Sequence, residues 1–301
     1  PGSTVRTSTC TVSVSACSAA KSIEFSALYY RDDAESRERR LLGTITRPPY
    51  KLVWDLSHLP NQFFRGATIV AQTRLGDEET SEVRQEGVFL AHQGFAAPEK
   101  SVPFASKPYA PNRSALIRLS GPDDGRGSDK EVTASIWWNK RGLFVTVDAR
   151  DPLFYAGMPA EQRVRMGCEI LIDPSEHPAP YPTDSVVALC VPLHGEAYRR
   201  HYQPRFLDDG GYQLSARTET CTSDVTLTTS DFKGWRVSCR LDRSIFGGEL
   251  PDDIKYNVVV TLLDEDYDVR HYSWIEGNLF ATYTPLRWGT LRLRNRPMLQ
   301  I

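Results

Sequence analysis

The feature that most constrains this fold is an alternation of apolar and polar residues in the middle of the chain. It runs through VTASIWW (132–138), stops at a short polar break, and resumes in LFVTVD (143–148). Period-two alternation on both sides of a short turn predicts a half-buried β-hairpin. The segment CEILIDP (168–174) predicts a further strand that ends at Asp-Pro, because proline cannot extend a hydrogen-bonded ladder.

Strand-like segments recur on both sides of this hairpin. Downstream lie GWRVSCRL (234–241), YNVVVTLLDED (256–266) and WGTLRLR (288–294). Upstream, short strand-like runs with turns about every ten residues fill positions 9–92, where helical periodicity is almost absent. The sequence therefore predicts an all-β protein with two β-sandwich domains. The charged run Arg31–Arg40 is interpreted as a solvated loop rather than a binding patch.

A proline-rich segment marks the predicted domain boundary. Residues 94–112 (GFAAPEKSVPFASKPYAPN) contain small residues and repeated prolines without alternation. Because proline removes a backbone donor and favours extended backbone, this composition is typical of a semi-rigid linker or of an irregular edge segment. We predict a first domain at 4–94, a linker at 95–112 and a second domain at 113–296.

Charge and hydropathy exclude several function classes. The chain has 301 residues and a formal net charge of −2, which gives no field that would attract nucleic acid or an anionic membrane. No apolar run approaches the roughly 20 residues that cross a bilayer, so we expect no direct membrane insertion. No signal peptide is visible, and Pro1-Gly2-Ser3 reads as a cloning remnant. We expect a soluble piece of a longer protein.

The six cysteines do not match a zinc-binding pattern, since no two stand in C-x-x-C spacing. Cys168 and Cys190 come close if the strand 168–173 folds back on 185–190 around the prolines between them. Placed on one face, they would form either a disulfide or two buried thiols, and both alternatives stay open.

No catalytic motif is present. The sequence lacks a nucleophile elbow, a phosphate-binding glycine loop and a zinc-protease helix. Glu169 and Asp173 stand four apart on one predicted strand, so they share a face. They would act as glycosidase carboxylates only across an open cleft. We predict that the protein is not an enzyme.

The first domain resembles bacterial immunoglobulin-like domains. The resemblance lies in residues 49–83, where an aromatic strand ends in Trp-Asp, a Leu-Pro turn follows, and an alternating strand leads into an acidic turn. The matching residues are Trp54, Asp55, Leu59, Pro60, Ile69 and Ala71. Such domains are mostly spacers or adhesive stalks on secreted and surface proteins.

The second domain resembles family 9 carbohydrate-binding modules and the related DOMON domains. In order, the shared features are a strand ending near Trp138, then LFVTVDARDP, CEILIDP, GWRVSCRL, an Asn-Val-Val-Val strand running into LLDEDYD, Trp274 and WGTLRL. The resemblance implies a jelly-roll sandwich. This chain departs from the family's acidic-Gly-x-x-x-Trp opening, where it has residues 106–121 (SKPYAPNRSALIRLSG).

In sugar-binding members of that family, two aromatic rings enclose a terminal sugar while polar side chains bind its hydroxyls. Trp274 corresponds to one ring. The other is missing, because no aromatic residue lies between Ala156 and Ile172. Phe154 or Tyr155 is the expected substitute. Arg163 and Asp266 are the polar candidates, whereas Trp137, Trp138, Trp235 and Trp288 are expected to be core or strand-packing residues.

Two further ligands follow from the same resemblance. The carboxylates of Asp264, Asp266 and Asp268 alternate in an acidic loop, a pattern that suits a structural calcium ion. DOMON relatives bind haem b through methionine and histidine, for which Met166 and His271 are the candidates. A solvated turn and a packed methionine are the respective alternatives.

These observations predict a non-catalytic, extracytoplasmic fragment of a larger surface or secreted protein, which binds a carbohydrate or a protein partner. The first alternative is a structural or protein-interaction spacer that has lost its sugar site, as the missing aromatic suggests. The second is a redox module that carries haem. Because a sandwich fold does not fix function, the choice depends on the site.

Overall fold

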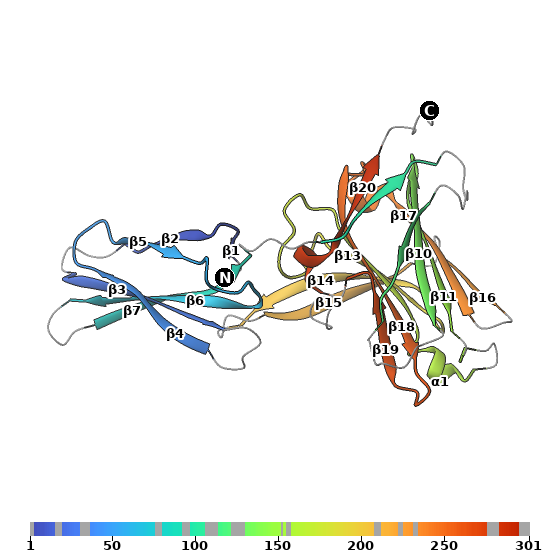
Figure 1. The fold of residues 1–301 in the computed structure, drawn as a ribbon, viewed down its shortest axis with the longest axis horizontal. Coiled ribbons are helices and arrows are strands. Elements are labelled where there is room, and N and C mark those ends of the chain that lie inside the picture. Colours follow the sequence, from blue (N-terminus) through green and yellow to red (C-terminus); the bar gives the residue numbers. More distant parts are fainter. Residues whose placement is uncertain are drawn as a thin grey trace. The chain divides into compact units, whose positions relative to one another are not determined.

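The computed structural model describes thirteen segments of the chain. They are residues 3–15, 20–30, 37–75, 80–91, 97–105, 114–121, 130–151, 153–154, 158–207, 212–221, 225–230, 234–275 and 283–294. Nearly all of the regular structure in them is β-strand, as Figure 1 shows. The chain forms two compact units, of which unit 1 comprises residues 1–96 and 204–215 and unit 2 comprises 97–203 and 216–301.

Unit 1 consists of a five-stranded sheet, in the order β1-β7-β6-β3-β4, and the strand pair β2-β5. The strands are β1 (Ser3–Val5), β2 (Thr9–Ser13), β3 (Ser22–Tyr30), β4 (Arg37–Ile45), β5 (Lys51–Asp55), β6 (Gln62–Arg74) and β7 (Thr80–Leu90). Alternate residues of β3 are buried, and Tyr29 packs with Trp54 of β5 in the apolar core. The alternation of β3 therefore supplies the face that the β2-β5 pair covers.

Unit 2 contains two larger sheets. One has five strands in the order β16-β17-β11-β10-β9; the other has eight, in the order β15-β14-β13-β12-β18-β20-β8 with β19 paired to β18. The elements are β8 (Glu99–Pro103), β9 (Ala115–Arg118), β10 (Glu131–Asn139), β11 (Gly142–Arg150), α1 (Ala160–Arg163), β12 (Gly167–Asp173), β13 (Val187–Pro192), β14 (Tyr198–Phe206), β15 (Tyr212–Thr220), β16 (Val225–Ser230), β17 (Gly234–Asp242), η2 (Arg243–Phe246), β18 (Asp253–Leu263), β19 (Val269–Ser273), η3 (Pro285–Arg287) and β20 (Gly289–Arg294).

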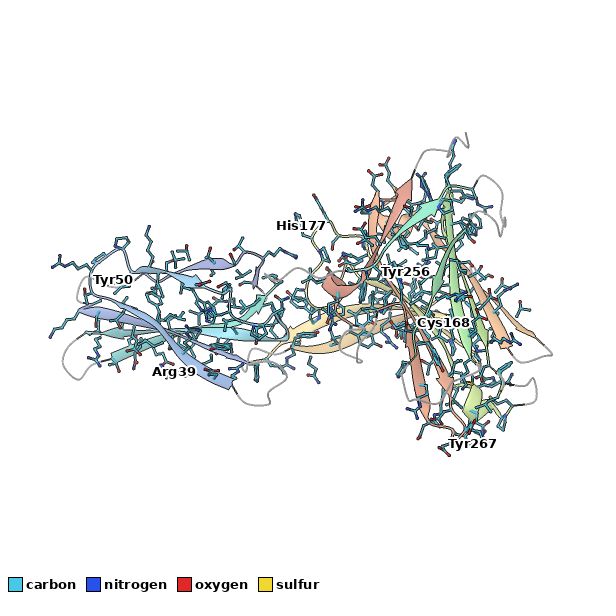
Figure 2. All side chains as sticks on the ribbon, viewed as in Figure 1. Arg39, Tyr50, Cys168, His177, Tyr256 and Tyr267 are labelled. Atoms are coloured by element: carbon cyan, nitrogen blue, oxygen red, sulfur yellow. The ribbon has the colours of Figure 1, made fainter. Side chains whose placement is uncertain are left out.

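The core of unit 2 lies between these sheets. The predicted hairpin is β10–β11, where Ile136 pairs with Val145 in antiparallel register. Its inward residues pack against those of β12 and β18 in one continuous apolar cluster. Figure 2 shows side chains filling this region, including Cys168 and Tyr256. The all-β fold class with two sandwiches is confirmed, whereas the relations to immunoglobulin-like and DOMON domains stay predictions.

The predicted linker was partly wrong. Within it, β8 pairs in parallel with β20, and Val102 is fully buried in the core of unit 2. Pro98 just before the strand and Pro103 at its end conceal β8 in the sequence, yet β8 lies at the sheet edge, where proline is tolerated. The interpretation of Arg31–Arg40 as a solvated loop was also partly wrong, since β4 begins at Arg37. Residues 31–36 lie outside the described part of the chain.

Among the described residues, no helix is both long and apolar enough to cross a membrane.

Candidate ligand-binding site

Strand β12 separates two chemically different faces of the eight-stranded sheet. Its residues Cys168, Ile170 and Ile172 belong to the apolar core, so period-two geometry sends Glu169 to the opposite face. The Glu169 side chain is 15% exposed there, and its partner across the antiparallel pair with β13 is Cys190. A mostly buried carboxylate needs hydrogen-bond donors, and the neighbouring strands supply them.

Strand β14 contributes three polar side chains to the same face. Tyr198 pairs with Cys190, and the two-residue spacing brings Arg200 and Tyr202 to the side on which Glu169 lies. In the segment YRRHY (198–202), the alternate residues Tyr198, Arg200 and Tyr202 therefore lie on the face of Glu169. The adjacent pair Arg199-Arg200 does not act together.

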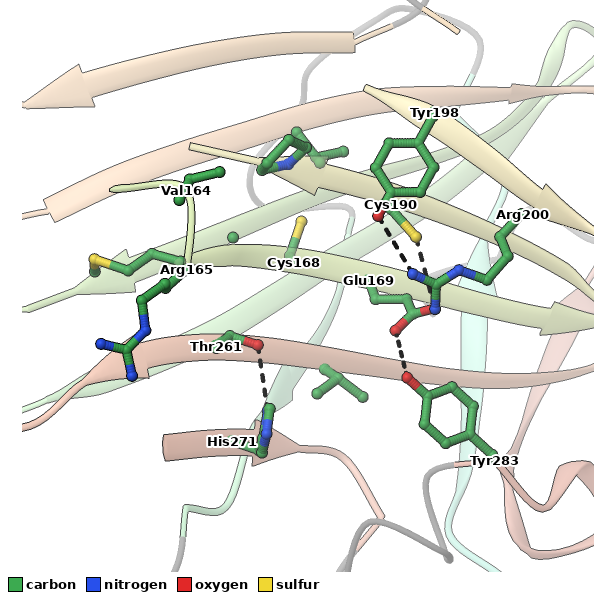
Figure 3. Close-up of a pocket in the computed structure, with 15 residues that line it drawn as sticks. Val164, Arg165, Cys168, Glu169, Cys190, Tyr198, Arg200, Thr261, His271 and Tyr283 are labelled. Carbon is green, nitrogen blue, oxygen red and sulfur yellow. Dashed lines mark hydrogen bonds and ion pairs between the residues drawn. The ribbon is translucent and has the colours of Figure 1, made fainter. Parts of the chain in front are cut away.

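These residues converge on the Glu169 carboxylate (Figure 3). Its Oε1 accepts hydrogen bonds from Arg200 Nη1 at 3.1 Å and from the Tyr202 hydroxyl at 3.0 Å. Its Oε2 accepts one from the Tyr283 hydroxyl at 3.0 Å. Arg200 Nη2 in turn donates to the Tyr198 hydroxyl at 3.3 Å. Charge-assisted hydrogen bonds of this kind hold the Glu169 and Arg200 side chains in fixed positions before any ligand binds.

A cavity of about 220 Å³ opens beside this network. Its described lining also includes Arg165, from the turn after α1, and Thr261 and His271, from β18 and β19. Thr261 Oγ1 and His271 Nδ1 lie 3.2 Å apart and form a hydrogen bond. The volume is below the range of roughly 300–1,000 Å³ typical of drug-sized ligands, so the cavity suits a single ring or the end of a chain.

Burial and the Glu169 charge together shift the ionisation of the network. Burial, followed by the Glu169 charge, raises the pKa of the Cys190 thiol to about 12. The same two causes raise the pKa of the Tyr202 and Tyr283 hydroxyls above their ordinary value. Burial, the largest single cause, lowers the pKa of the Arg200 guanidinium, but Glu169 together with Cys190 and Tyr202 outweighs it, so the net pKa is raised. At neutral pH the hydroxyls therefore stay protonated as donors and Arg200 stays charged.

Trp274, the predicted aromatic platform, does not line this cavity, so its role as a ligand ring stays a prediction. Trp274 packs on Tyr256 with ring centroids 5.9 Å apart, and its ring occupies the space where a side chain at Gly289 would lie. Alternation along β19 and just beyond it explains this position. His271 reaches the cavity, whereas Tyr272 and Trp274 turn toward the core.

The other predicted ligand residues do not assemble around the cavity either. Phe154 is 1% exposed and belongs to the core, so it cannot replace a missing sugar-binding ring. Tyr155 lies outside the described residues. Arg163 is on α1 and is not among the described lining residues, and Asp266 is exposed in a turn. In contrast, the buried positions predicted for Trp137, Trp138, Trp235 and Trp288 are confirmed.

In the acidic loop, the Asp264 carboxylate bonds to groups of the loop itself and to Arg270. Asp264 Oδ1 accepts the backbone N–H groups of Asp266 at 3.0 Å and Asp268 at 2.8 Å, and Oδ2 pairs with Arg270 at 2.7 Å. In the described part of the chain, no group of three or more His, Cys, Asp or Glu side chains is placed to hold a metal ion. The loop is therefore closed by hydrogen bonds and an ion pair, and its three carboxylates do not form a calcium-binding set.

The candidate haem ligands do not fit an axial pair. Met166 is 2% exposed and packs in the core, whereas His271 is exposed and hydrogen-bonds Thr261. The side chain of Met166 is thus committed to packing, and haem ligation would require it to leave the core.

The proposed proximity of Cys168 and Cys190 on one face was wrong. Cys190 pairs with Glu169 across the two strands, one position away from Cys168, so the two side chains lie on opposite faces. Both are free thiols in the structure.

The sequence gave partial signals for the site. Glu169 is a charged residue in an otherwise apolar strand, and it was considered as half of a carboxylate pair. Its expected partner Asp173 is instead buried, with Oδ1 accepting Ser175 N–H at 3.0 Å and Ser185 Oγ–H at 3.2 Å. No local pattern links Glu169 to Tyr283, which is 114 residues away.

Comparisons with known proteins give fold-level similarity alone. No protein-family model and no curated protein matches the sequence. Among solved structures, the chain is similar to a family 9 carbohydrate-binding module from Caldicellulosiruptor kristjanssonii in complex with cellotriose. The identity is 14%, the TM-score is 0.43, and the match covers 67% of this chain and 96% of the other. It is also similar to a family 9 module from that organism in complex with glucose. There the identity is 15%, the TM-score is 0.42, and the match covers 66% of this chain and 97% of the other. We therefore infer function from the cavity itself.

Proposed function

We propose that unit 2 is a non-catalytic carbohydrate-recognition module whose ligand enters the cavity beside Glu169. The observation that supports this function is the network of one carboxylate, one guanidinium and three tyrosine hydroxyls beside a small open cavity, which Glu169, Arg200, Tyr198 and Tyr283 line. A few aimed polar groups on a preformed concave surface are what a small polar ligand requires.

The chemistry of the network matches sugar hydroxyls. Each hydroxyl can donate to a carboxylate and accept from a guanidinium, so Glu169 and Arg200 together can bind two vicinal hydroxyls. The half-buried rings of Tyr198 and Tyr283 supply flat apolar surface for the C–H groups of a sugar ring. Arg200 lies over the Tyr198 ring at 5.9 Å and holds it in place.

The same geometry argues for binding without catalysis. Glycoside hydrolysis uses two carboxyl groups about 5–10 Å apart on either side of the scissile bond. Among the described cavity residues, Glu169 is the one carboxylate, and it is engaged by Arg200 and by the Tyr202 and Tyr283 hydroxyls. It therefore lacks both a partner acid and the freedom of a proton shuttle.

We place this module outside the cytoplasm, as a recognition part of a larger surface or secreted protein. This follows the sequence resemblance to extracellular modules. Two alternatives are a module that binds a surface protein instead of a sugar and a purely structural spacer. Neither would bind a glycan, so the following experiment separates both from the proposed function.

The test is a glycan array with the full chain, followed by calorimetry with the best ligand. Glu169→Gln keeps the side-chain shape but removes the charge that Arg200 pairs with, so we expect at least about ten-fold weaker binding. The matched control is Arg292→Ala, because Arg292 pairs with Glu99 in an exposed contact away from the cavity. The proposal fails if no glycan binds, or if Glu169→Gln binds as the unmodified protein does.

A further inference from the structure

The cavity has two chemically different ends. At one end Glu169 is paired with Arg200 and surrounded by tyrosine hydroxyls. Figure 3 shows Arg165 at the opposite end, with Thr261 and His271 along the wall between them. A ligand that fills the cavity therefore contacts a neutralised polar network at one end and a separate cation at the other.

The backbone fixes the position of Arg165. Its N–H donates to Gln162 O at 3.1 Å, the next N–H donates to Arg163 O at 3.1 Å, and Leu193 N–H returns to Met166 O at 3.0 Å. Because Met166 is buried in the core, the adjacent Arg165 is directed outward, where it is exposed and lines the cavity. The buried Met166 side chain thus fixes the turn, and the preceding Arg165 side chain extends toward the cavity.

Charge counting shows that this cation is in excess. The described lining contains two arginines and one glutamate, and Glu169 already pairs with Arg200 at 3.1 Å. Within the described ranges, the Arg165 guanidinium makes no ion pair and no hydrogen bond. A guanidinium fork matches the planar oxygen pair of a carboxylate and also the oxygens of a sulfate.

We propose that the ligand is an anionic saccharide, with its hydroxyls bound at the Glu169–Arg200 end and its acidic group bound by Arg165. This assignment rests on the proposed sugar-binding function and narrows it from carbohydrates in general to acidic ones. His271 and Thr261 provide hydrogen-bonding groups between the two ends. The acidic group is disfavoured at the Glu169 end, because Arg200 is already paired there and the Glu169 carboxylate repels a second anion.

The experiment compares matched sugars by calorimetry with the full chain at low salt. The probes are glucose, glucuronate and glucose 6-sulfate, together with galactose and galacturonate. We expect at least one acidic sugar to bind about ten-fold more tightly than its neutral counterpart, and we expect added salt to reduce this preference. Glucuronate or galacturonate preference assigns a carboxylate, and preference for the sulfate assigns a sulfated sugar.

Variants locate the preference. Arg165→Gln should abolish the preference by weakening acidic sugars far more than their neutral counterparts, and Arg165→Lys should keep part of it, since the charge remains without the fork. The matched control Arg236→Gln changes an exposed arginine on the other sheet, which pairs with Asp148, and should leave both affinities unchanged.

Two results overturn the inference and leave the proposed function standing. These are equal affinity for neutral and acidic sugars, and an acid preference that survives in Arg165→Gln. If none of the sugars nor any glycan of the array binds, the sugar-binding function itself fails.

Discussion

The two faces of the eight-stranded sheet in unit 2 use the same strands for opposite purposes. On the core face, Cys168 and Ile170 of β12 meet apolar residues from the facing sheet. On the cavity face, Glu169, which lies between them, is held by Arg200 and two tyrosines. Both faces bury side chains, but the core face does so by apolar packing, whereas the cavity face does so by hydrogen-bonding and ion-pairing the Glu169 carboxylate. Stability and recognition are thus separable at successive residues of one strand.

The largest effect that tests this comparison concerns the two thiols on opposite faces. Burial raises the pKa of Cys168 well above 9.0, and burial with the Glu169 charge raises that of Cys190 to about 12. At pH 8 a pKa of about 12 leaves about a thousand-fold less thiolate than a pKa of 9. We expect both to react with iodoacetamide about a thousand-fold or more slowly in the native protein than in urea, as followed by peptide mass spectrometry.

The half-buried Cys10 and Cys221 serve as internal controls and should react faster. The faces are then told apart with Glu169→Gln, which removes a charge in contact with Cys190. In this variant, the labelling of Cys190 should become faster, while the labelling of Cys168 should change little. Fast native labelling of Cys168 would contradict the packed core face.

The second effect comes from Ile170, the core-facing neighbour of Glu169. Ile170 is fully buried, so Ile170→Ala should lower the free energy of unfolding by about 3 kcal/mol through lost burial and a residual cavity. Urea denaturation measures this change. Ligand affinity of the folded variant should stay unchanged, in contrast to Glu169→Gln. A matching loss of affinity in Ile170→Ala would mean that the faces are not independent.

The smallest effect is alkaline destabilisation. A thiol whose folded pKa is raised stabilises the fold fully below its unfolded pKa of 9.0, and this contribution is lost as the pH rises toward the folded value. For Cys190 we expect the free energy of unfolding to fall by about 1 kcal/mol between pH 8 and pH 10. Cys190→Ala should remove this part of the pH dependence, and an unchanged slope would contradict the raised pKa.

The sequence predicted the strands of unit 2 well and the site poorly. The segments around Ile136, Val145 and Ile170 became strands because local alternation and turn residues specify them. Trp274 was expected beside the ligand from a family pattern, but alternation from His271 puts it on the other side of the strand, partly buried against the core. Strand β8 was missed because Pro98 and Pro103, which flank and end it, are typical of a linker until its edge position is known.

The amino-acid sequence by itself determined an all-β chain and the alternation that gives each strand an apolar and a polar face, since both follow from local chemistry. The tertiary structure decided which polar residues meet. Glu169, Arg200 and Tyr283 lie on different segments, and their encounter depends on strand order, register and the return of the chain beside β18. Those are long-range pairings, selected by the burial of the whole core, and no local pattern encodes them.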